Sequence, residues 1–263
     1  MTTDNDKSTN GKASEKRVPE IKDTLRAPLP KRFYKSAAIV ERDGGFAITL
    51  DGRSVKTPGR KRELVVPVAA LAEAIAEEWN RQGERIDPAT MPLTRLANSA
   101  IEAVSERMTE VRDDIVAFAG SDLLCYRAET PAALVARQKA AWDPVLAWAK
   151  QTLGADFKVQ QGLMPIDQPP EATQAIAKAL ADLDALCLSA VHILTTITGS
   201  AILAVAYLKG RLTAEEVWAA ATVDETWQRE QWGQDAEAEA QAAKRLAEFT
   251  AASLCLRLLH PPR

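Results

Sequence analysis

The spacing of hydrophobic and polar positions changes once along the 263-residue chain. From residue 31 onward, short β-prone runs are separated by the turn sequences Asp43-Gly44-Gly45 and Asp51-Gly52. Asp-Gly between alternating runs is the strongest short-range signal of a β-hairpin. The pattern therefore predicts an antiparallel meander, with strands near 37–40, 46–50 and 54–57 and a fourth at 64–66.

A helical spacing begins after Pro67. Leu71, Ile75 and Trp79 recur one turn apart within 68–82, which is typical of an amphipathic helix that covers one face of a sheet. Beyond Pro92, almost every segment has a helical pattern. We therefore expect an α+β fold, in which a small N-terminal antiparallel β meander with a covering helix is followed by a mainly α-helical bundle domain.

The same patterns divide the chain into three parts. Residues 1–30 hold many charged and small polar residues and few large apolar ones, so they cannot bury enough surface to offset the entropy of ordering. We expect a disordered tail at 1–30, a small α/β domain at 31–92 and an α-helical domain at 93–263.

Residues 185–208 form a long run without a formal charge. Its length meets the rule for a membrane-spanning helix. His192, several hydroxyl residues and Gly199 interrupt it, however, and no basic or aromatic anchor precedes it. The pattern favours a buried helix at the centre of a bundle, with Gly199 allowing a close approach or a break; membrane association is the alternative.

The segment 217–239 has no proline and is predicted to form one helix. On a helical wheel, Asp224, Gln228 and Asp235 fall on the face that should carry the core stripe, and Trp232 points elsewhere. Buried amides and carboxylates are costly unless they are paired. Either another part of the chain satisfies these groups, or they line a surface for a partner.

Composition narrows the possible functions. A net charge of −3 argues against nucleic-acid binding. Three scattered cysteines and two histidines give neither a disulfide framework nor a zinc or histidine-based site, and no phosphate-binding glycine loop occurs. Cys125, among apolar neighbours, is interpreted as a packed thiol. We therefore expect a binding protein without cofactor, metal or catalytic residues; an enzyme that uses Cys125 at a site between the domains is the alternative.

Eight short motifs occur in order between residues 31 and 239, and together they resemble one family. They are RFYK (32–35), LDGRSVKTP (50–58), EEW (77–79), MPLTRLANSAIE (91–102), SDLLCYRA (121–128), WDP (142–144), TGS (198–200) and QxxxWG (228–233). The chain resembles the assembly chaperones of the F-type ATP synthase catalytic head that attend the alpha subunit.

The resemblance implies a function that composition does not reveal. It implies a molecular chaperone that binds free alpha subunit and shields its beta-facing interface until assembly, without nucleotide hydrolysis. It also implies a small α/β domain followed by a helical one. We expect a monomer without stable membrane insertion, in the bacterial cytoplasm, because the first thirty residues are too acidic for a mitochondrial presequence.

The resemblance also suggests site residues. The family's late acidic motif corresponds to Asp235-Ala236-Glu237, where an acid is expected at the position of Ala236, so the choice between its two neighbours stays open. The candidate partner-binding residues are Glu237, Asp235, Trp232, Gln228 and Asp224. An internal network between the last helices is the alternative for these groups. In the motif at 121–128, Asp122 and Arg127 are expected to pair with each other in a structural role.

Overall fold

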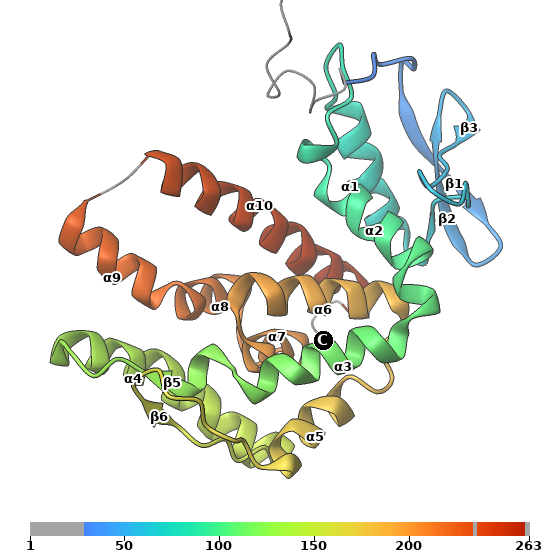
Figure 1. Cartoon of the computed structure of the whole chain (residues 1–263). Coiled ribbons are helices and arrows are strands. Elements are labelled where there is room, and N and C mark those ends of the chain that lie inside the picture. The colour runs from blue at the N-terminus through green and yellow to red at the C-terminus, as the bar shows by residue number, and fades with distance from the viewer. Residues whose placement is uncertain (1–28, 234–235, 261–263) are drawn as a thin grey trace, which may run out of the picture.

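The computed structural model describes residues 29–233 and 236–260 (Figure 1), so most of the tail expected at 1–30 lies outside the described residues. A small antiparallel sheet comes first. Its central strand β2 pairs with β1 along one edge and with β3 and β4 along the other. The strands are β1 (Ala37–Arg42), β2 (Gly45–Leu50), β3 (Arg53–Ser54) and β4 (Val65–Val66). The expected meander is confirmed.

Helix α1 (Ala69–Asn80) covers this sheet. It buries Leu71 and Ile75 completely, which gives the sheet the apolar cover that a few short strands need. At its end, the side-chain amide of Asn80 accepts a hydrogen bond from the N–H of Ala37 at 2.8 Å and donates one to the carbonyl of Ala37 at 3.0 Å. These two bonds fix the register of the helix on β1.

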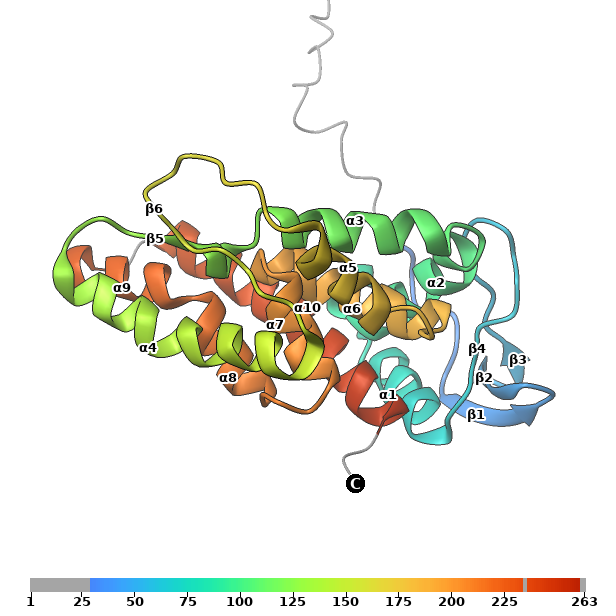
Figure 2. The same ribbon diagram turned by 90° about the horizontal axis from the view of Figure 1, so that it is seen from below.

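The other helices form one mostly α-helical body, so the α+β fold class is confirmed (Figures 1 and 2). They are α2 (Pro92–Glu102), α3 (Met108–Gly120), α4 (Ala132–Trp148), α5 (Pro170–Ala179), α6 (Ala185–Thr198), α7 (Ala201–Leu208), α8 (Ala214–Ala221), α9 (Val223–Trp232) and α10 (Ala236–Leu259). Two short parallel strands, β5 (Tyr126–Arg127) and β6 (Gln160–Gln161), lie beside α4 (Figure 2).

Helix α2 joins the sheet part to the helical part. Both carboxylate oxygens of Glu78 in α1 accept hydrogen bonds at the start of α2, from the N–H of Leu93 at 2.7 Å and the N–H of Thr94 at 2.8 Å. The opposite side of α2 packs on α6 and α10. Since α2 contacts both parts, we keep the division into 31–92 and 93–263 as a proposal.

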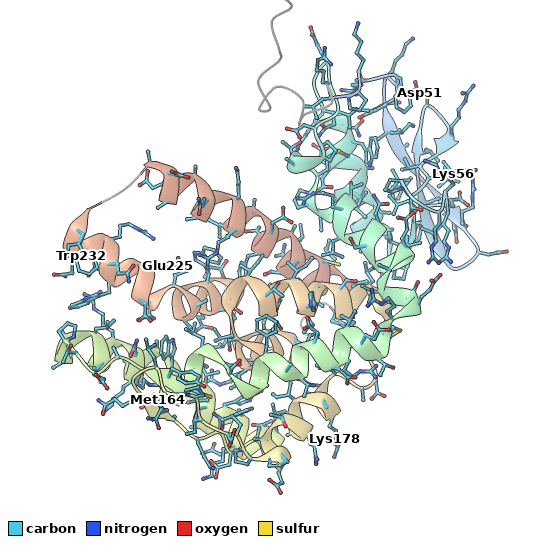
Figure 3. All side chains as sticks on the ribbon, viewed as in Figure 1. Asp51, Lys56, Met164, Lys178, Glu225 and Trp232 are labelled. Carbon is cyan, nitrogen blue, oxygen red and sulfur yellow. The ribbon has the colours of Figure 1, made fainter. Side chains whose placement is uncertain are left out.

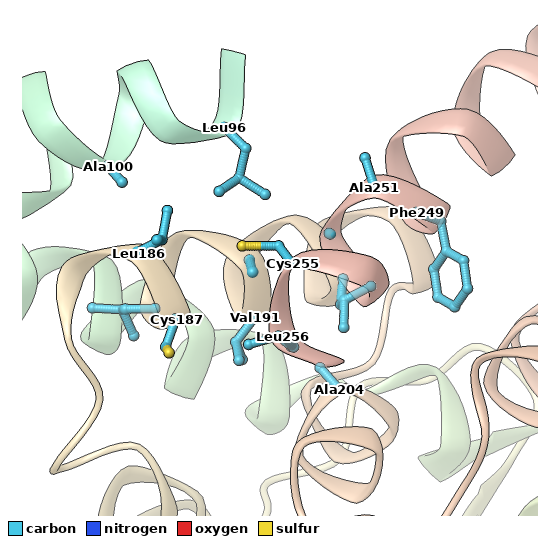
Figure 4. Packing of buried hydrophobic residues seen from close by; sticks show 14 of the residues in the cluster. Leu96, Ala100, Leu186, Cys187, Val191, Ala204, Phe249, Ala251, Cys255 and Leu256 are labelled. Carbon is cyan, nitrogen blue, oxygen red and sulfur yellow. The ribbon is translucent and has the colours of Figure 1, made fainter. Parts of the chain in front are cut away.

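The uncharged run 185–208 forms two helices at the centre of the body. Gly199 has a φ of 69°, a left-handed conformation that ends α6, and the hydroxyl of Ser200 accepts from the N–H of Leu203 to begin α7. Most of the residues of α6 and α7 are buried, and Figure 4 shows α6 packed against α2 and α10. The expected core location and break are confirmed. Within 29–233 and 236–260, no helix is long and apolar enough to cross a membrane.

The expectation of one helix over 217–239 is wrong. The chain forms α8, α9 and the first turn of α10 instead. The first break is at Thr222, whose hydroxyl bonds back to the carbonyl of Trp218 at 2.8 Å. The second is at Gly233, with a φ of 85° and a ψ of −170° that no helix continues. A helical wheel drawn through both breaks therefore misplaced the faces of this segment.

Asp122 connects α3 to α7 from a fully buried position. Its carboxylate accepts hydrogen bonds from the N–H of Leu124 and of Ile202, each at 3.0 Å, so it caps the N-terminus of α7. Burial raises the pKa of Asp122 to about 6 despite these bonds. The expected pair with Arg127 is absent from the described ion pairs, because the guanidinium of Arg127 binds Asp143 instead. The structural role expected for Asp122 is supported, but with a different partner.

We predict that Asp122→Ala lowers the free energy of unfolding by about 2–4 kcal/mol, because it leaves two buried N–H groups without an acceptor. Urea unfolding followed by circular dichroism measures the change. Asp156→Ala is the control, since this carboxylate is exposed and makes a surface pair with Lys150; its loss costs at most about 1 kcal/mol. Equal losses for the two variants would contradict the capping role.

Candidate functional site

Helix α9 lies between α4 and α10 at the end of the molecule remote from the sheet (Figure 1). Its first turn is fixed to α4 through Gln138, whose side chain is buried. The amide oxygen of Gln138 accepts from the N–H of Ala128 at 2.8 Å, and its amide nitrogen donates to Asp224 at 2.7 Å. The carboxylate of Asp224 therefore has its hydrogen-bond partner in another part of the chain, on α4 and not on the last helices.

A further polar contact, which joins α4 to α8, lies in the interior of the protein. The indole N–H of Trp142 donates to the carbonyl of Ala220 at 2.7 Å, and the tryptophan is fully buried. The guanidinium of Arg127 lies 4.8 Å from the centre of the Trp142 ring, and it also pairs with Asp143 at 2.8 Å. The cation is thus buried against a ring and a carboxylate, an arrangement that holds the second half of α4 and the β5 strand together.

Ion pairs fix both sides of α9. On the α4 side, Arg137 binds Glu230 at 2.7 Å and stacks 4.8 Å from the centre of the Trp227 ring. On the α10 side, Arg245 binds Glu225 at 2.6 Å. Arg245 also donates to the carbonyl of Ile197 at 3.2 Å, so it connects α10 to the end of α6 as well. Helix α9 is therefore held along two edges.

The remaining face of α9 is open to solvent. Trp232 is 80% exposed and Gln228 is exposed, as is Glu237 in the first turn of α10. Figure 3 shows Trp232 at the far end of α9, whereas Glu225 lies back toward the body of the protein. Asp235 lies outside the described residues. We call the group Gln228, Trp232 and Glu237 the α9–α10 tip.

The structure thus divides the predicted site residues. Asp224 bonds to α4, whereas Gln228, Trp232 and Glu237 are exposed. The sequence did not reveal the partners Arg137, Gln138 and Arg245, because they are distant along the chain and on helices with many other charges. The one available signal was Trp227 beside several charged residues, which does not identify its cation.

A cysteine and a histidine are the other side chains that could act in catalysis or metal binding. Cys125 is fully buried, and burial together with the charge of Asp122 raises the pKa of its thiol to about 12. His192 is half-buried and contacts Asp114 at 2.6 Å, so it is satisfied at the surface and not in the core. Among the described residues, no group of three or more His, Cys, Asp or Glu side chains is arranged to hold a metal ion.

Comparison with known proteins gives a consistent answer. The family model of the ATP12 chaperone protein matches residues 31–150. The crystal structure of Atp12 from Paracoccus denitrificans has a TM-score of 0.80 and 44% identity, covering 87% of this chain and 98% of that one. A crystal structure from Agrobacterium tumefaciens has a TM-score of 0.84 and 45% identity, covering 93% and 92%. The chain belongs to the ATP12 chaperone family.

A more distant relative has the same family name. Mitochondrial protein atp12 of Schizosaccharomyces pombe is 28% identical over 223 residues, which are 79% of this chain and 76% of that protein. Membership in the ATP12 family confirms the resemblance found in the sequence motifs and makes the chain a chaperone for F-type ATP synthase assembly.

We predict that Gln138→Ala lowers the free energy of unfolding by about 2–3 kcal/mol, because it leaves the N–H of Ala128 and the carboxylate of Asp224 without their partner. Chemical unfolding followed by tryptophan fluorescence measures the loss. Lys139→Ala is the matched control, since Lys139 is the next residue of α4, is exposed and forms no ion pair with a described residue. A Gln138→Ala variant as stable as this control would refute the network.

Proposed function

We propose that this ATP12-family protein binds the free alpha subunit of the F-type ATP synthase and shields its beta-facing surface until beta subunits arrive. Family membership supports the chaperone role. The observation that carries the assignment of the site is Trp232, a large aromatic side chain that is 80% exposed on a helix fixed along both edges. Tryptophan at a rigid, exposed position is the residue most enriched at binding hot spots.

The arrangement of the α9–α10 tip suits a protein partner. The indole of Trp232 offers apolar area, and Gln228, one turn earlier on α9, offers an amide beside it. An interface of this type has an aromatic centre and a polar rim. Because α9 is already ordered by its pairs with α4 and α10, little conformational entropy remains to be lost when Trp232 is covered.

Binding alone is sufficient for this role. An alpha subunit without its neighbours exposes an apolar interface that favours aggregation. A protein that occupies this interface stabilises the assembly-competent form by mass action, by about 2.7 kcal/mol at a concentration a hundredfold above the dissociation constant. Release requires only that beta subunits compete for the same surface, so the proposal includes no catalytic step.

The individual residues have different proposed roles. Trp232, Gln228 and Glu237 contact the client, and Asp235, which lies outside the described residues, is proposed to contribute to the same surface. Asp224 acts indirectly in this proposal, since its bond to Gln138 sets the position of α9. We also propose a monomer in a bacterial cytoplasm; identities of 44% and 45% with bacterial proteins, against 28% with the mitochondrial relative, support the bacterial source.

We predict that Trp232→Ala weakens binding of purified alpha subunit about tenfold or more, because it removes the exposed aromatic anchor. Glu237→Lys and Asp235→Lys are expected to weaken it as well, by placing a cation where the surface has an acid. Fluorescence anisotropy with labelled alpha subunit gives the dissociation constants, and suppression of alpha-subunit aggregation provides a second measure.

The control for these variants is Phe33→Ala, which removes an aromatic side chain that is 75% exposed in the sheet part of the molecule. It should leave both measurements unchanged. If the Trp232→Ala, Glu237→Lys and Asp235→Lys variants all fold and hold alpha subunit as the unmodified protein does, the assignment of the site is wrong. If the unmodified protein holds no alpha subunit, the proposed client is wrong.

The buried thiol gives a test of the enzyme alternative. We predict that Cys125 in the native protein reacts with iodoacetamide far more slowly than a free thiol at pH 8, because burial raises the pKa of the thiol to about 12 and keeps it protonated. Mass spectrometry of the alkylated protein, with the urea-unfolded chain as control, identifies the modified residue. Rapid modification of Cys125 alone would favour a reactive site instead.

A further inference from the structure

A second exposed apolar surface lies on the loop between β6 and α5. The loop between β6 and α5 arches away from the helices in Figure 2, and Figure 3 marks Met164 on it. Leu163 is 95% exposed and Met164 72% exposed, and Leu163 is the most exposed large apolar side chain among the described residues. Placing two such side chains in water is unfavourable unless another molecule covers them.

The base of this loop is held closed. The side-chain oxygen of Gln168 accepts from the N–H of Lys158 at 2.8 Å, and its amide nitrogen donates to the carbonyl of Lys158 at 3.0 Å. The N–H of Gly162 donates to the carbonyl of Arg127 at 2.9 Å, next to the β5–β6 pairing. The two apolar side chains therefore project from a loop whose two ends are fixed together.

Gly162 sets the direction of the loop. Its φ of 82° lies in the left-handed region, and a Cβ atom there would approach the carboxylate of Glu129 to 2.8 Å. Any other residue would strain this turn. The exposed position of Leu163 and Met164 thus follows from a specific backbone turn.

Beside the base of the loop is a groove of about 370 Å³ between α4 and residues 156–159. Leu146, Phe157 and Val159 line it, and Val159, which is 47% exposed, comes directly before β6. The groove and the exposed loop are therefore connected along the chain by the short strand β6.

The charges that line the groove do not all cancel. Arg127 pairs with Asp143 at 2.8 Å, and Lys150 pairs with Asp156 at 2.7 Å. Lys139 also lines the groove and makes no ion pair with any residue that the structure describes. The ammonium group of Lys139 beside the apolar part of the groove would complement a segment that carries a single acidic side chain between apolar ones.

We propose that the groove and the 162–166 loop bind an extended apolar segment of a client polypeptide, with an acidic side chain of that segment next to Lys139. Leu163 and Met164 cover the segment from the loop side, while Leu146 and Phe157 contact it from below. The identity of the client as alpha subunit rests on the proposed function, whereas the chemistry of the segment rests on the groove itself. This surface is separate from the α9–α10 tip, so the two surfaces give the protein two points of attachment to one client.

The experiment measures binding of short fluorescein-labelled peptides to the full chain by fluorescence anisotropy. One peptide alternates leucine or valine with threonine around a central glutamate, and its partner peptide has lysine in place of the glutamate. The unmodified protein is expected to prefer the glutamate peptide. The double variant Leu163→Ser, Met164→Ser weakens that binding about tenfold or more, and Lys139→Glu reverses the preference between the two peptides.

Two further variants distinguish the effect of the closed loop base on peptide binding from the effect of removing any exposed apolar side chain. Gln168→Ala keeps every apolar side chain but opens the base of the loop, so it should weaken peptide binding less than the double variant does. Phe33→Ser is the control, because it removes an apolar side chain that is 75% exposed, close to the 72% of Met164, and lies outside the groove; it should leave binding of both peptides unchanged. Circular dichroism confirms that each variant is folded.

The same variants are then tested with purified alpha subunit. Weaker binding of both peptide and alpha subunit by the loop variant supports the inference. If the glutamate peptide binds as described but alpha subunit does not bind even to the unmodified protein, the groove is confirmed and the proposed function fails. If alpha subunit binds and neither ligand responds to the loop and Lys139 variants, the inference is overturned and the proposed function stands. Binding of the loop to phosphatidylglycerol vesicles in place of the peptides would also overturn it.

Discussion

The structure depends on burial of a stretch of chain that has no polar face. Helices α6 and α7 contain no Asp, Glu, Lys or Arg, and most of their residues are buried. Such helices must be covered on every side, so α2, α3 and α10 pack around them (Figure 4). The break at Gly199 places the N-terminus of α7 inside the core. The first N–H groups of that helix have no partner within the helix, so they require another acceptor. Asp122 supplies that acceptor, at the cost of burying a carboxylate.

Around this core, polar pairs position the parts that face solvent. Gln138 and Arg137 of α4 hold one edge of α9, and Arg245 of α10 holds the other. Most of these pairs are partly exposed, so each one contributes little to stability. Their main effect is geometric, because they fix a short helix with no buried residue of its own. The exposed Trp232 is thereby held at a defined place at the end of the molecule.

A chaperone that works by binding needs surfaces that remain apolar in water without causing the protein itself to aggregate. Among the described residues, the large apolar side chains that are most exposed are separated from one another: Trp232 at the end of α9, Leu163 with Met164 on the loop after β6, and Phe33 before β1. Each is attached to a rigid base and has charged neighbours, which limits the size of any continuous apolar patch. In the proposed arrangement, two small, separate surfaces would give a larger total affinity for one client than either would give alone.

The sequence by itself determined the fold class, the meander with its covering helix and the buried central run, because these follow from local periodicity and turn residues such as Asp51-Gly52 and Gly199. It also determined the family, since eight short motifs in order are specific even when none is so alone. It did not determine the division of 217–239 into three helices. The breaks at Thr222 and Gly233 are short, and the residues around them are typical of helices, so the local pattern is that of one continuous helix. Only the tertiary structure decided that Asp224 faces α4, that Arg127 pairs with Asp143, and that Leu163 and Met164 are exposed. Those outcomes depend on which distant groups meet in space, and local spacing along a chain holds no information about that.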